Sequence, residues 1–140
     1  MTPQEQITQL RDESLLLPQL MLDTQHHLIN GMYARVVLAP AGTTITSAGH
    51  LTDHYLIMVG EVIVTVNGVP TRFSGYNIIP TKAGGGARAI YAVTDCWAVN
   101  VCRTDKTEVA DIEDQLFENA HMLQTRNPLL GKAKLTELGE

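Results

Sequence analysis

The chain has 140 residues, of which 44% are hydrophobic and 18% are charged, and this length suits one domain that needs neither disulfides nor a metal to hold its core together. The formal net charge of -5 provides no global field that would favour a nucleic acid polymer or an anionic membrane surface. No apolar run approaches the roughly 20 residues that span a bilayer, and the N-terminus lacks a signal-peptide pattern, so we expect a cytoplasmic protein.

Residues 1–32 are predicted to form an N-terminal arm. Residues 15–18 are expected to be extended rather than helical, because Pro18 disfavours the α conformation of the residue before it. The arm should lie along the rest of the molecule or along a neighbouring subunit.

Residues 33–104 carry the pattern of a β-barrel. Short β-like runs cover 33–39, 54–59, 61–66, 71–73, 77–79, 89–93 and 96–103, each about as long as an ordinary strand. Residues that favour tight turns stand between them, such as Gly42, Gly60 and the pair Asn67-Gly68. Because no helical stretch separates the strands, the pattern indicates a sandwich or barrel rather than βαβ units.

The two cysteines are predicted to be reduced and buried. Cys96 and Cys102 fall within one predicted strand, where a rise of about 3.3 Å per residue separates them by roughly 20 Å. A disulfide needs Cα atoms about 4.4 to 6.8 Å apart, so we expect none between them. Reduced cysteines also suit a cytoplasmic setting.

Residues 105–124 are predicted to form a C-terminal helix. Apolar residues recur there every three or four positions and form one stripe: Val109, Ile112, Leu116, Ala120 and Leu123. Asp105 and Glu108 resemble a capping pair at its start. The helix should cover the barrel or a dimer contact, and residues 125–140 are expected to be a loose tail or a second short interface segment.

Residues 40–61 resemble the first sequence motif of the cupin family, in which a PAG turn leads to two histidines, an acidic residue and a glycine. Gly42 and Gly60 match its two glycines, and His50 matches its second histidine. Ala48 stands at the position of the first histidine. The acidic position falls on Asp53 or on its neighbour His54, depending on where one gap residue is placed.

Residues 75–90 resemble the second cupin motif. Pro80 and the run Gly84-Gly85-Gly86 match its proline and glycine, whereas Arg88 and its neighbours replace its histidine. The resemblance covers residues 33–103 and implies an all-β, cupin-type double-stranded β-helix (jelly-roll) barrel with a ligand cavity inside. The layout is similar to that of small cupins encoded in bacteriophage genomes, most of which have no assigned function.

His50 and His54 are the candidate metal ligands, with Asp53 as a third. In a straight strand the two histidines would lie about 13 Å apart, too far to share an ion bound at about 2.1 Å. Gly49 and Thr52 allow a bend that would bring them together. A cofactor bound by this set would be a divalent metal, namely zinc, iron or manganese. The alternative, which is slightly preferred, is that both histidines are hydrogen-bonding residues that line a cavity, and a further one is that they are surface turn residues.

The glycine-rich stretch 81–88 is a candidate anion site. Consecutive glycines (Gly84, Gly85, Gly86) let backbone N–H groups converge on a phosphate or carboxylate, while Lys82 and Arg88 add positive charge. Arg88 is the preferred binding group, because its planar guanidinium grips such anions with two hydrogen bonds. The alternative is an ordinary flexible loop with two solvated cations.

Four aromatic residues complete the candidate set: Tyr55, Tyr76, Tyr91 and Trp97. Most of them are expected in the core. One or two, with Tyr91 preferred, can stack on a ring or a sugar of the ligand.

Three functions are compatible with these features. The first, which Arg88 and the degenerate metal motifs favour, is a non-enzymatic protein that binds a small anionic ligand, such as a nucleotide-like signal sequestered by a phage in the host cytoplasm. The second is a metal-dependent cupin enzyme of dioxygenase or isomerase type that uses His50 and His54. The third is a phage virion component or assembly factor. We expect a homo-oligomer, a dimer or larger, with no membrane or nucleic acid partner.

Overall fold

The computed structural model describes residues 2–16, 22–66, 68–126 and 134–137. Its helices are α1 (Pro3–Ser14) and α2 (Val109–Leu116), and two short 3-10 helices follow, η1 (Ala120–Met122) and η2 (Gln124–Arg126). Its strands are β1 (Asp23–Ile29), β2 (Met32–Ala39), β3 (Thr44–Thr46), β4 (His54–Val59), β5 (Val62–Val66), β6 (Val69–Phe73), β7 (Tyr76–Thr81), β8 (Ala89–Ala92), β9 (Cys96–Arg103) and β10 (Lys134–Glu137). In the described part of the chain, neither helix is long and apolar enough to cross a membrane.

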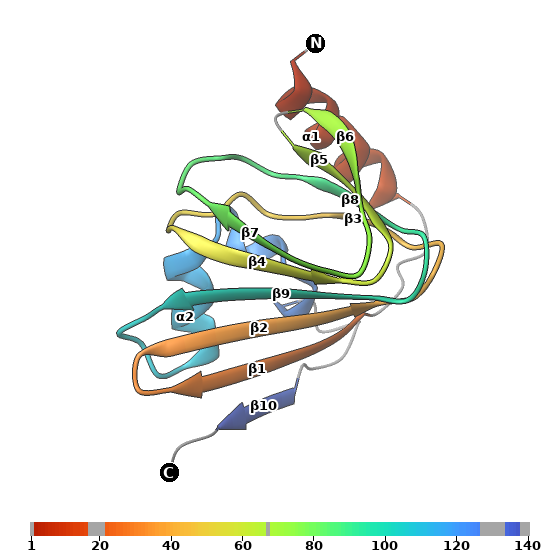
Figure 1. Cartoon of the computed structure of the whole chain (residues 1–140). Helices are drawn as coiled ribbons and strands as arrows, with labels where there is room; N and C mark the ends of the chain where they lie inside the picture. Colours follow the sequence, from red (N-terminus) through yellow and green to blue (C-terminus); the bar gives the residue numbers. More distant parts are fainter. Residues whose placement is uncertain (1, 17–21, 67, 127–133, 138–140) are drawn as a thin grey trace.

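The strands form two sheets (Figure 1). The six-stranded sheet has the order β10-β1-β2-β9-β4-β7, and the four-stranded sheet has the order β3-β8-β5-β6. Strands β2 to β9 pair in antiparallel fashion, and the chain passes back and forth between the sheets. This interleaving is the arrangement of an eight-stranded jelly roll. The predicted fold class, an all-β cupin-type jelly-roll barrel followed by a C-terminal helix, is confirmed.

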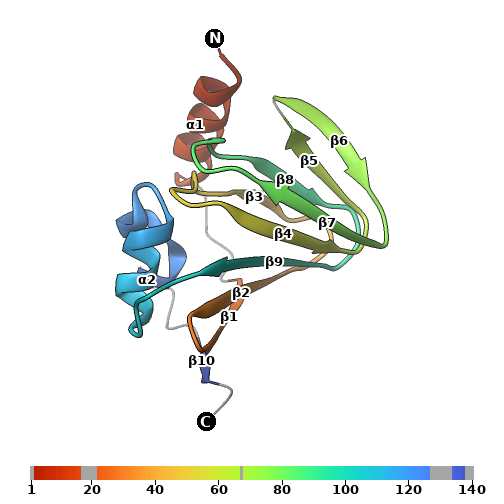
Figure 2. The ribbon, with the colours of Figure 1, turned by 60° about the vertical axis from the view of Figure 1, so that its left-hand side comes forward.

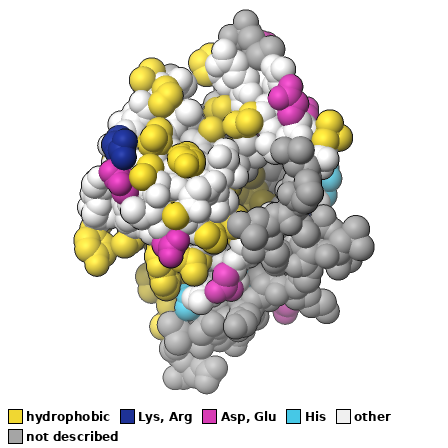
Figure 3. Space-filling model, turned by 90° about the vertical axis from the view of Figure 1, so that its right-hand side faces the viewer, with side chains coloured by type: hydrophobic (Ala, Val, Ile, Leu, Met, Phe, Trp, Pro, Cys, Tyr) yellow, Lys and Arg dark blue, Asp and Glu magenta, His cyan; other side chains and the backbone are white. Residues whose placement is uncertain are grey.

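Alternation along the strands builds the core. In β4, His54, Leu56 and Met58 are buried while Tyr55 is exposed, because successive side chains of a strand point to opposite faces. At the end of the barrel that carries the turns after β2, β4 and β8, which we call the turn end, the interior is apolar. It is filled by Ala39, Leu56, Met58, Val62, Val64, Ile90, Ala92, Cys96 and Ala98. In the view toward this end, the described surface carries mainly hydrophobic and uncharged side chains, with scattered acidic, basic and histidine side chains between them (Figure 3).

Gly60 lets β4 turn directly into β5. Its φ of +115° lies in the region that disfavours other residues, and a Cβ there would stand 2.8 Å from the carbonyl oxygen of Asp95. Its N–H donates a hydrogen bond of 2.9 Å to the carbonyl of Gly75. The backbone geometry therefore requires the glycine that the first cupin motif predicts at this turn.

Helix α2 closes the opposite end of the barrel, which we call the α2 end (Figure 2). Ile112 and Leu116 are buried there with Tyr33 of β2. The residue after the helix, Phe117, forms an isolated antiparallel bridge with His50, which lies in the β3–β4 connection. Both the helix and the residues that follow it are thus fixed over the interior of the barrel.

Residues 1–32, predicted to form an N-terminal arm, contain α1 and β1, and β1 pairs with β2 in the six-stranded sheet. A capping box starts α1: the Thr2 hydroxyl accepts from the Glu5 N–H at 3.1 Å, and the Glu5 carboxylate accepts from the Thr2 N–H at 2.9 Å. Leu15 has helical backbone angles at the end of α1, so the extended conformation predicted for it is wrong. Residues 17–21 lie outside the described residues.

The C-terminal helix is shorter than the predicted range 105–124. It ends at Leu116, because Phe117 has an extended backbone with φ -118° and ψ 138°. The Glu108 side chain makes no cap hydrogen bond, so the predicted capping pair is wrong. The predicted apolar stripe is confirmed at its centre, where Ile112 and Leu116 are buried. Within the predicted tail, β10 pairs in parallel with β1.

Both cysteines are buried and free, as predicted. The expectation that most of the four aromatic residues lie in the core is wrong, because their exposed fractions range from 41% to 86%. They occupy outward positions of their strands. Tyr91, for example, stands between the buried residues Ile90 and Ala92 of β8.

Candidate functional site

The α2 end of the barrel interior holds buried polar side chains beside an apolar cluster, whereas the turn end is apolar. Four of the buried polar or charged side chains lie toward the α2 end: His26, Arg35, His54 and Glu113. The first three come from β1, β2 and β4, and the last comes from α2. Because buried polar groups need partners, this is the part of the interior where ligand chemistry is expected.

The β3–β4 connection brings His50 and His54 together. The chain bends at residues 51–52, and the two imidazole rings stack with their centroids 3.8 Å apart and an interplanar angle of 19°. The edge of the His50 ring also packs against Phe117, with centroids 4.8 Å apart. The predicted bend, and the proximity of the two histidines that depends on it, are confirmed.

Both imidazoles are neutral at neutral pH. Burial lowers the pKa of His50 to about 3, with further contributions from the proximity of His54 and from the positive charge of Arg88. Burial also lowers the pKa of His54 from its usual value. The Nδ1 atom of His54 lies 3.2 Å from the carbonyl oxygen of Thr52, so in the neutral ring Nδ1 carries the proton and Nε2 keeps its lone pair.

The arrangement fits a shared metal ion poorly. An ion about 2.1 Å from one nitrogen of each ring would hold the two centroids roughly 5 Å apart, whereas the rings of His50 and His54 stack at 3.8 Å. The third candidate ligand, Asp53, is exposed, accepts from the Ala83 N–H at 2.8 Å and lies 3.6 Å from the Lys82 ammonium. Within the described residues, no three His, Cys, Asp or Glu side chains are grouped so that they could hold a metal ion.

Other groups of the protein bind the backbone of the glycine-rich loop. The Gly84 N–H donates to the carbonyl of His50 at 3.0 Å. The Ala87 N–H donates to the side-chain oxygen of Gln4 in α1, and the Ala87 carbonyl accepts from the same amide, both at 3.0 Å. A Cβ on Gly86 would stand 2.5 Å from that Gln4 side chain. The loop thus holds the N-terminal helix through two of its backbone groups.

Three more of the predicted ligand contacts lie on the surface. The Lys82 side chain is 91% exposed, Gly85 is exposed, and Tyr91 is on the outer side of β8. Residues on an exposed loop and on the outer face of a strand do not meet a group inside the barrel. The structure therefore does not bring these three together with the interior site.

Arg88 is the predicted ligand residue that reaches into the barrel. Its Nη2 donates to the Thr81 hydroxyl at 3.2 Å, and Thr81 lies directly opposite His54 in the β4–β7 pair. Its backbone is fixed by Ser47, which accepts from the Arg88 N–H at 3.0 Å and donates its own N–H to the Arg88 carbonyl at 2.8 Å. Burial lowers the pKa of Arg88, but a guanidinium remains charged. Its positive charge therefore lies beside the two neutral histidines.

Five side-chain atoms are buried without a hydrogen-bond partner among the described residues. They are Nη1 of Arg88, Nε2 of His50, Oγ1 of Thr52, Oδ1 of Asn100 on β9 and Nε2 of His26. The set combines a charged donor with neutral donors and acceptors. Because natural interiors rarely leave such atoms unpaired, the set marks a place for polar groups from outside the chain.

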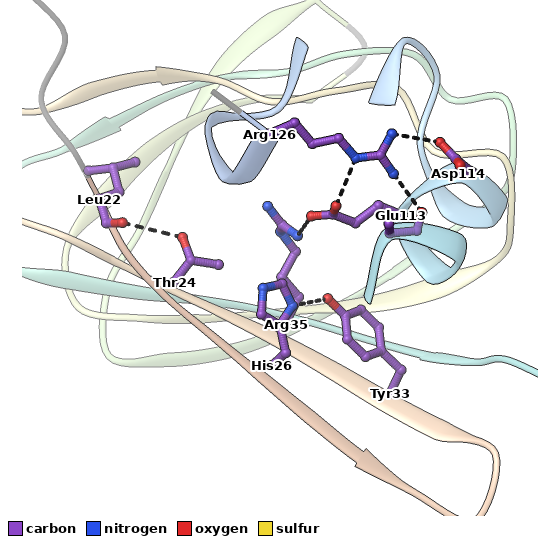
Figure 4. Close-up of polar contacts among 9 residues, drawn as sticks. Leu22, Thr24, His26, Tyr33, Arg35, Glu113, Asp114 and Arg126 are labelled. Carbon is purple, nitrogen blue, oxygen red and sulfur yellow. Dashed lines mark hydrogen bonds and ion pairs between the residues drawn. The ribbon is translucent and has the colours of Figure 1, made fainter. Parts of the chain in front are cut away.

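Sequence reasoning missed a charged network that links β2 to α2 (Figure 4). Arg35 donates from Nη1 to Glu113 Oε2 at 2.8 Å, and both side chains are buried. The second oxygen of Glu113 accepts from Nε of Arg126 at 3.1 Å, and Arg126 also pairs with Asp114 at 2.8 Å. The Arg35 guanidinium lies over the Phe117 ring, 5.2 Å from its centroid. This network fastens α2 to the barrel.

A buried His–Tyr pair extends the network on β1 and β2 (Figure 4). Nδ1 of His26 lies 2.6 Å from the Tyr33 hydroxyl. Burial, aided by the Arg35 charge, lowers the pKa of His26 to about 4, and burial raises the pKa of Tyr33 to about 12. The phenol therefore donates to a neutral imidazole. The sequence pattern that could have revealed these residues is strand alternation, because it turns Tyr33 and Arg35 toward the same inward face.

No protein-family model matches the sequence, and a comparison with curated proteins gives no match. Similar solved structures include a cupin-2 domain protein from Shewanella frigidimarina, which is 12% identical, with coverage of 68% of this chain and 92% of that chain and a TM-score of 0.46. A cupin superfamily protein from Desulfitobacterium hafniense is 11% identical, with coverages of 66% and 87% and a TM-score of 0.49. A conserved protein of unknown function from Streptococcus pyogenes is 20% identical, with coverages of 57% and 70% and a TM-score of 0.44.

Likeness at this level concerns the arrangement of strands alone and carries no inference about activity. The jelly-roll assignment rests on the strand order of this chain itself. The predicted similarity to bacteriophage cupins and the virion role stay predictions.

Proposed function

We propose that this protein binds a small anionic ligand in the α2 end of the barrel, and that Arg88 holds the anionic group. The ligand class is a carboxylate or a phosphate, including the phosphate of a nucleotide-like molecule. The observation that carries the proposal is the buried Nη1 of Arg88, which has no hydrogen-bond partner among the described residues.

A charged group inside a protein is costly when nothing compensates its charge. Among the residues that the structure describes, no carboxylate forms an ion pair with Arg88. A bound carboxylate or phosphate would supply both the missing charge and the acceptors that the planar guanidinium needs. Ligand binding is therefore the role that accounts for this arginine.

Neutral hydrogen-bonding groups also lie at the α2 end of the barrel. Nε2 of His54 keeps a lone pair, and Oγ1 of Thr52 is buried without a partner in the described chain. A ligand that carries a hydroxyl group beside its anionic group would satisfy both kinds of atom. We therefore expect a hydroxylated carboxylate or a sugar phosphate rather than a bare inorganic ion.

A metal-dependent cupin enzyme is the competing proposal, because a neutral imidazole with a free lone pair is a metal ligand. It requires the stacked rings of His50 and His54 to separate before they share an ion. Metal analysis of the purified protein distinguishes the two proposals. Stoichiometric zinc, iron or manganese that disappears in His50→Ala favours the enzyme, whereas ligand retention that survives EDTA favours the binding protein.

Native mass spectrometry of the protein purified from cells tests the binding proposal. We expect a non-covalent adduct on the wild type that is absent from Arg88→Met. Arg72→Met is the matched control and should keep the adduct, because Arg72 is exposed and pairs with Glu61 at 2.8 Å. Equal adduct occupancy in the wild type and in Arg88→Met would exclude Arg88 as the binding group.

A further inference from the structure

The outer face of the six-stranded sheet is apolar across four adjacent strands, β2, β9, β4 and β7. Three rows of directly paired residues cross it: Ala34-Val101-Tyr55-Pro80, Val36-Val99-Ile57-Ile78 and Leu38-Trp97-Val59-Tyr76. We call these residues the outer apolar face. None of them carries a charge. An antiparallel sheet that faces water normally has polar residues on that side, so this face departs from the usual pattern.

Much of the outer apolar face is open to solvent in the single chain. The exposed fractions are 86% for Tyr76, 67% for Ile78, 54% for Tyr55 and 46% for Trp97. Helix α2 packs on the inner face of the same sheet, and α1 lies beside the four-stranded sheet (Figures 1 and 2). At about 200 Å² for each fully exposed aromatic side chain, the three aromatic residues alone expose roughly 370 Å². That is already the size of the largest apolar patch on many monomers, about 300–600 Å².

The neighbouring outer surfaces are mixed rather than uniformly apolar. On the adjoining strand β1, the outward positions hold Asp23, Gln25 and His27, and Ile29 at its end. On the four-stranded sheet, Thr44, Thr46, Thr65 and Arg72 share the outward face with Ile63 and Tyr91. The continuous apolar face therefore spans β2, β9, β4 and β7, and polar residues occupy most of the outward positions of β1.

We propose that the outer apolar face is a homodimer interface, in which it packs against the same face of a second copy of this chain. Two sheets pack well face to face, with their strands about 30° apart. A two-fold dimer requires a surface that is complementary to itself, and an uncharged sheet face meets that requirement. Although each chain carries a net charge of -5, no like charges are brought together within this face.

The size of the face matches a second copy better than a peptide. With strands about 4.8 Å apart and same-face residues about 6.7 Å apart, it covers a flat area of roughly 400 Å². A standard interface buries about 800 Å² on each partner, with an apolar centre and a polar rim. The face supplies such a centre, and Gln25, His27 and Arg103 border it. A peptide would instead occupy a groove or one strand edge.

Trp97 provides a direct report on this interface, because it is the single tryptophan of the chain and lies within the face. Sedimentation of the full chain over a range of concentrations should show a dimer that dissociates on dilution. Over the same range the emission of Trp97 should move to longer wavelength, because the indole becomes hydrated when the copies separate. A dimer whose dissociation leaves the emission unchanged would use another surface and would overturn the proposal, as would a wild type that is monomeric throughout.

Ile78→Lys should raise the dimer dissociation constant at least tenfold, because it places a charge within the face. Val69→Lys is the matched control and should change nothing, since Val69 is 62% exposed but lies on β6 of the other sheet. Circular dichroism verifies that each variant is folded, and Tyr76→Lys replaces Ile78→Lys if the latter does not fold. A folded variant with lysine in the face that dimerises as tightly as the wild type would contradict the proposal. Because Arg88 lies inside the barrel, ligand retention measured on the same variants is a separate result.

Discussion

Arg35 and Arg88 place two positive charges inside the same end of the barrel, and their surroundings differ. Arg35 is 6% exposed and forms an ion pair with Glu113 at 2.8 Å. Arg88 is half-buried, donates from Nη2 to the Thr81 hydroxyl, and has an Nη1 without a partner among the described residues. One charge is thus compensated within the chain, and the other is not.

Under the proposed function, the difference separates a structural arginine, Arg35, from a binding arginine, Arg88. A buried ion pair contributes to the fold mainly through the penalty of breaking it, since removing one partner leaves the other charge buried without compensation. Removing a buried charge that has no such partner leaves no uncompensated charge behind, so it should leave the fold intact and remove an interaction with a ligand. We therefore expect opposite effects of mutation: breaking the Arg35 pair should lower the free energy of unfolding, whereas removing the Arg88 charge should lower ligand binding.

Glu113→Ala should give the largest loss of stability. It leaves Arg35 buried without its carboxylate, and breaking such a pair costs about 3–5 kcal/mol in the free energy of unfolding. Denaturant unfolding measures the loss. The matched control is Glu61→Ala, which breaks the exposed pair with Arg72 and should cost less than about 1 kcal/mol. Equal losses in the two variants would show that the buried network does not fasten α2.

Acid should destabilise the protein through its buried histidines. The unfolded chain protonates histidine near pH 6.5, whereas in the fold the pKa of His26 is about 4 and that of His50 is about 3. Below pH 6.5 the unfolded state therefore binds more protons, and the free energy of unfolding falls by up to about 1.4 kcal/mol per pH unit for each histidine until the folded-state pKa is reached.

Denaturant unfolding at about pH 7 and about pH 5 measures this slope. His50→Asn should make it shallower, whereas His121→Asn, a substitution of an exposed histidine, should keep it. A slope that is unchanged in His50→Asn would mean that His50 is not held neutral inside the barrel. Because the charge of Arg88 also lowers the pKa of His50, an anion bound to Arg88 should raise that pKa.

Arg88→Met should have the smallest effect on stability. In ligand-free protein we expect a change in the free energy of unfolding within about 1 kcal/mol, because no buried carboxylate loses its partner. The same unfolding experiment as for Glu113→Ala gives the value. A loss as large as that of Glu113→Ala would place Arg88 in the fold rather than in a binding site.

The sequence predicted the strands better than the helices, for physical reasons that differ between elements. The bounds of β4 and β9 agree with prediction to the residue, because alternation and flanking turn residues both mark their ends. Helix α1 was missed because it buries a single residue, Ile7, so that it has no apolar stripe. Its signal was the capping box that begins at Thr2.

Some residues of the candidate site were likewise predicted from the sequence and others were missed. Arg88 and the two stacked histidines were found because the cupin resemblance assigns positions to them. Glu113 was missed because its burial depends on Arg35, which lies 78 residues earlier in the sequence. Neither residue alone signals that pairing. Lys82 and Tyr91 were placed with Arg88 from proximity in the sequence, and the fold turns both to the surface.

The central claim is that Arg88 holds an anion inside the barrel. It is tested most directly by the thermal unfolding midpoint at constant ionic strength, with inorganic phosphate, a nucleoside monophosphate and a hydroxylated dicarboxylate as probes. A ligand at 100 times its dissociation constant stabilises the folded state by about 2.7 kcal/mol, so at least one probe should raise the midpoint of the wild type and of Arg72→Met by several degrees and leave that of Arg88→Met unchanged. An equal rise in Arg88→Met, or no rise with any probe in the wild type, would contradict the claim.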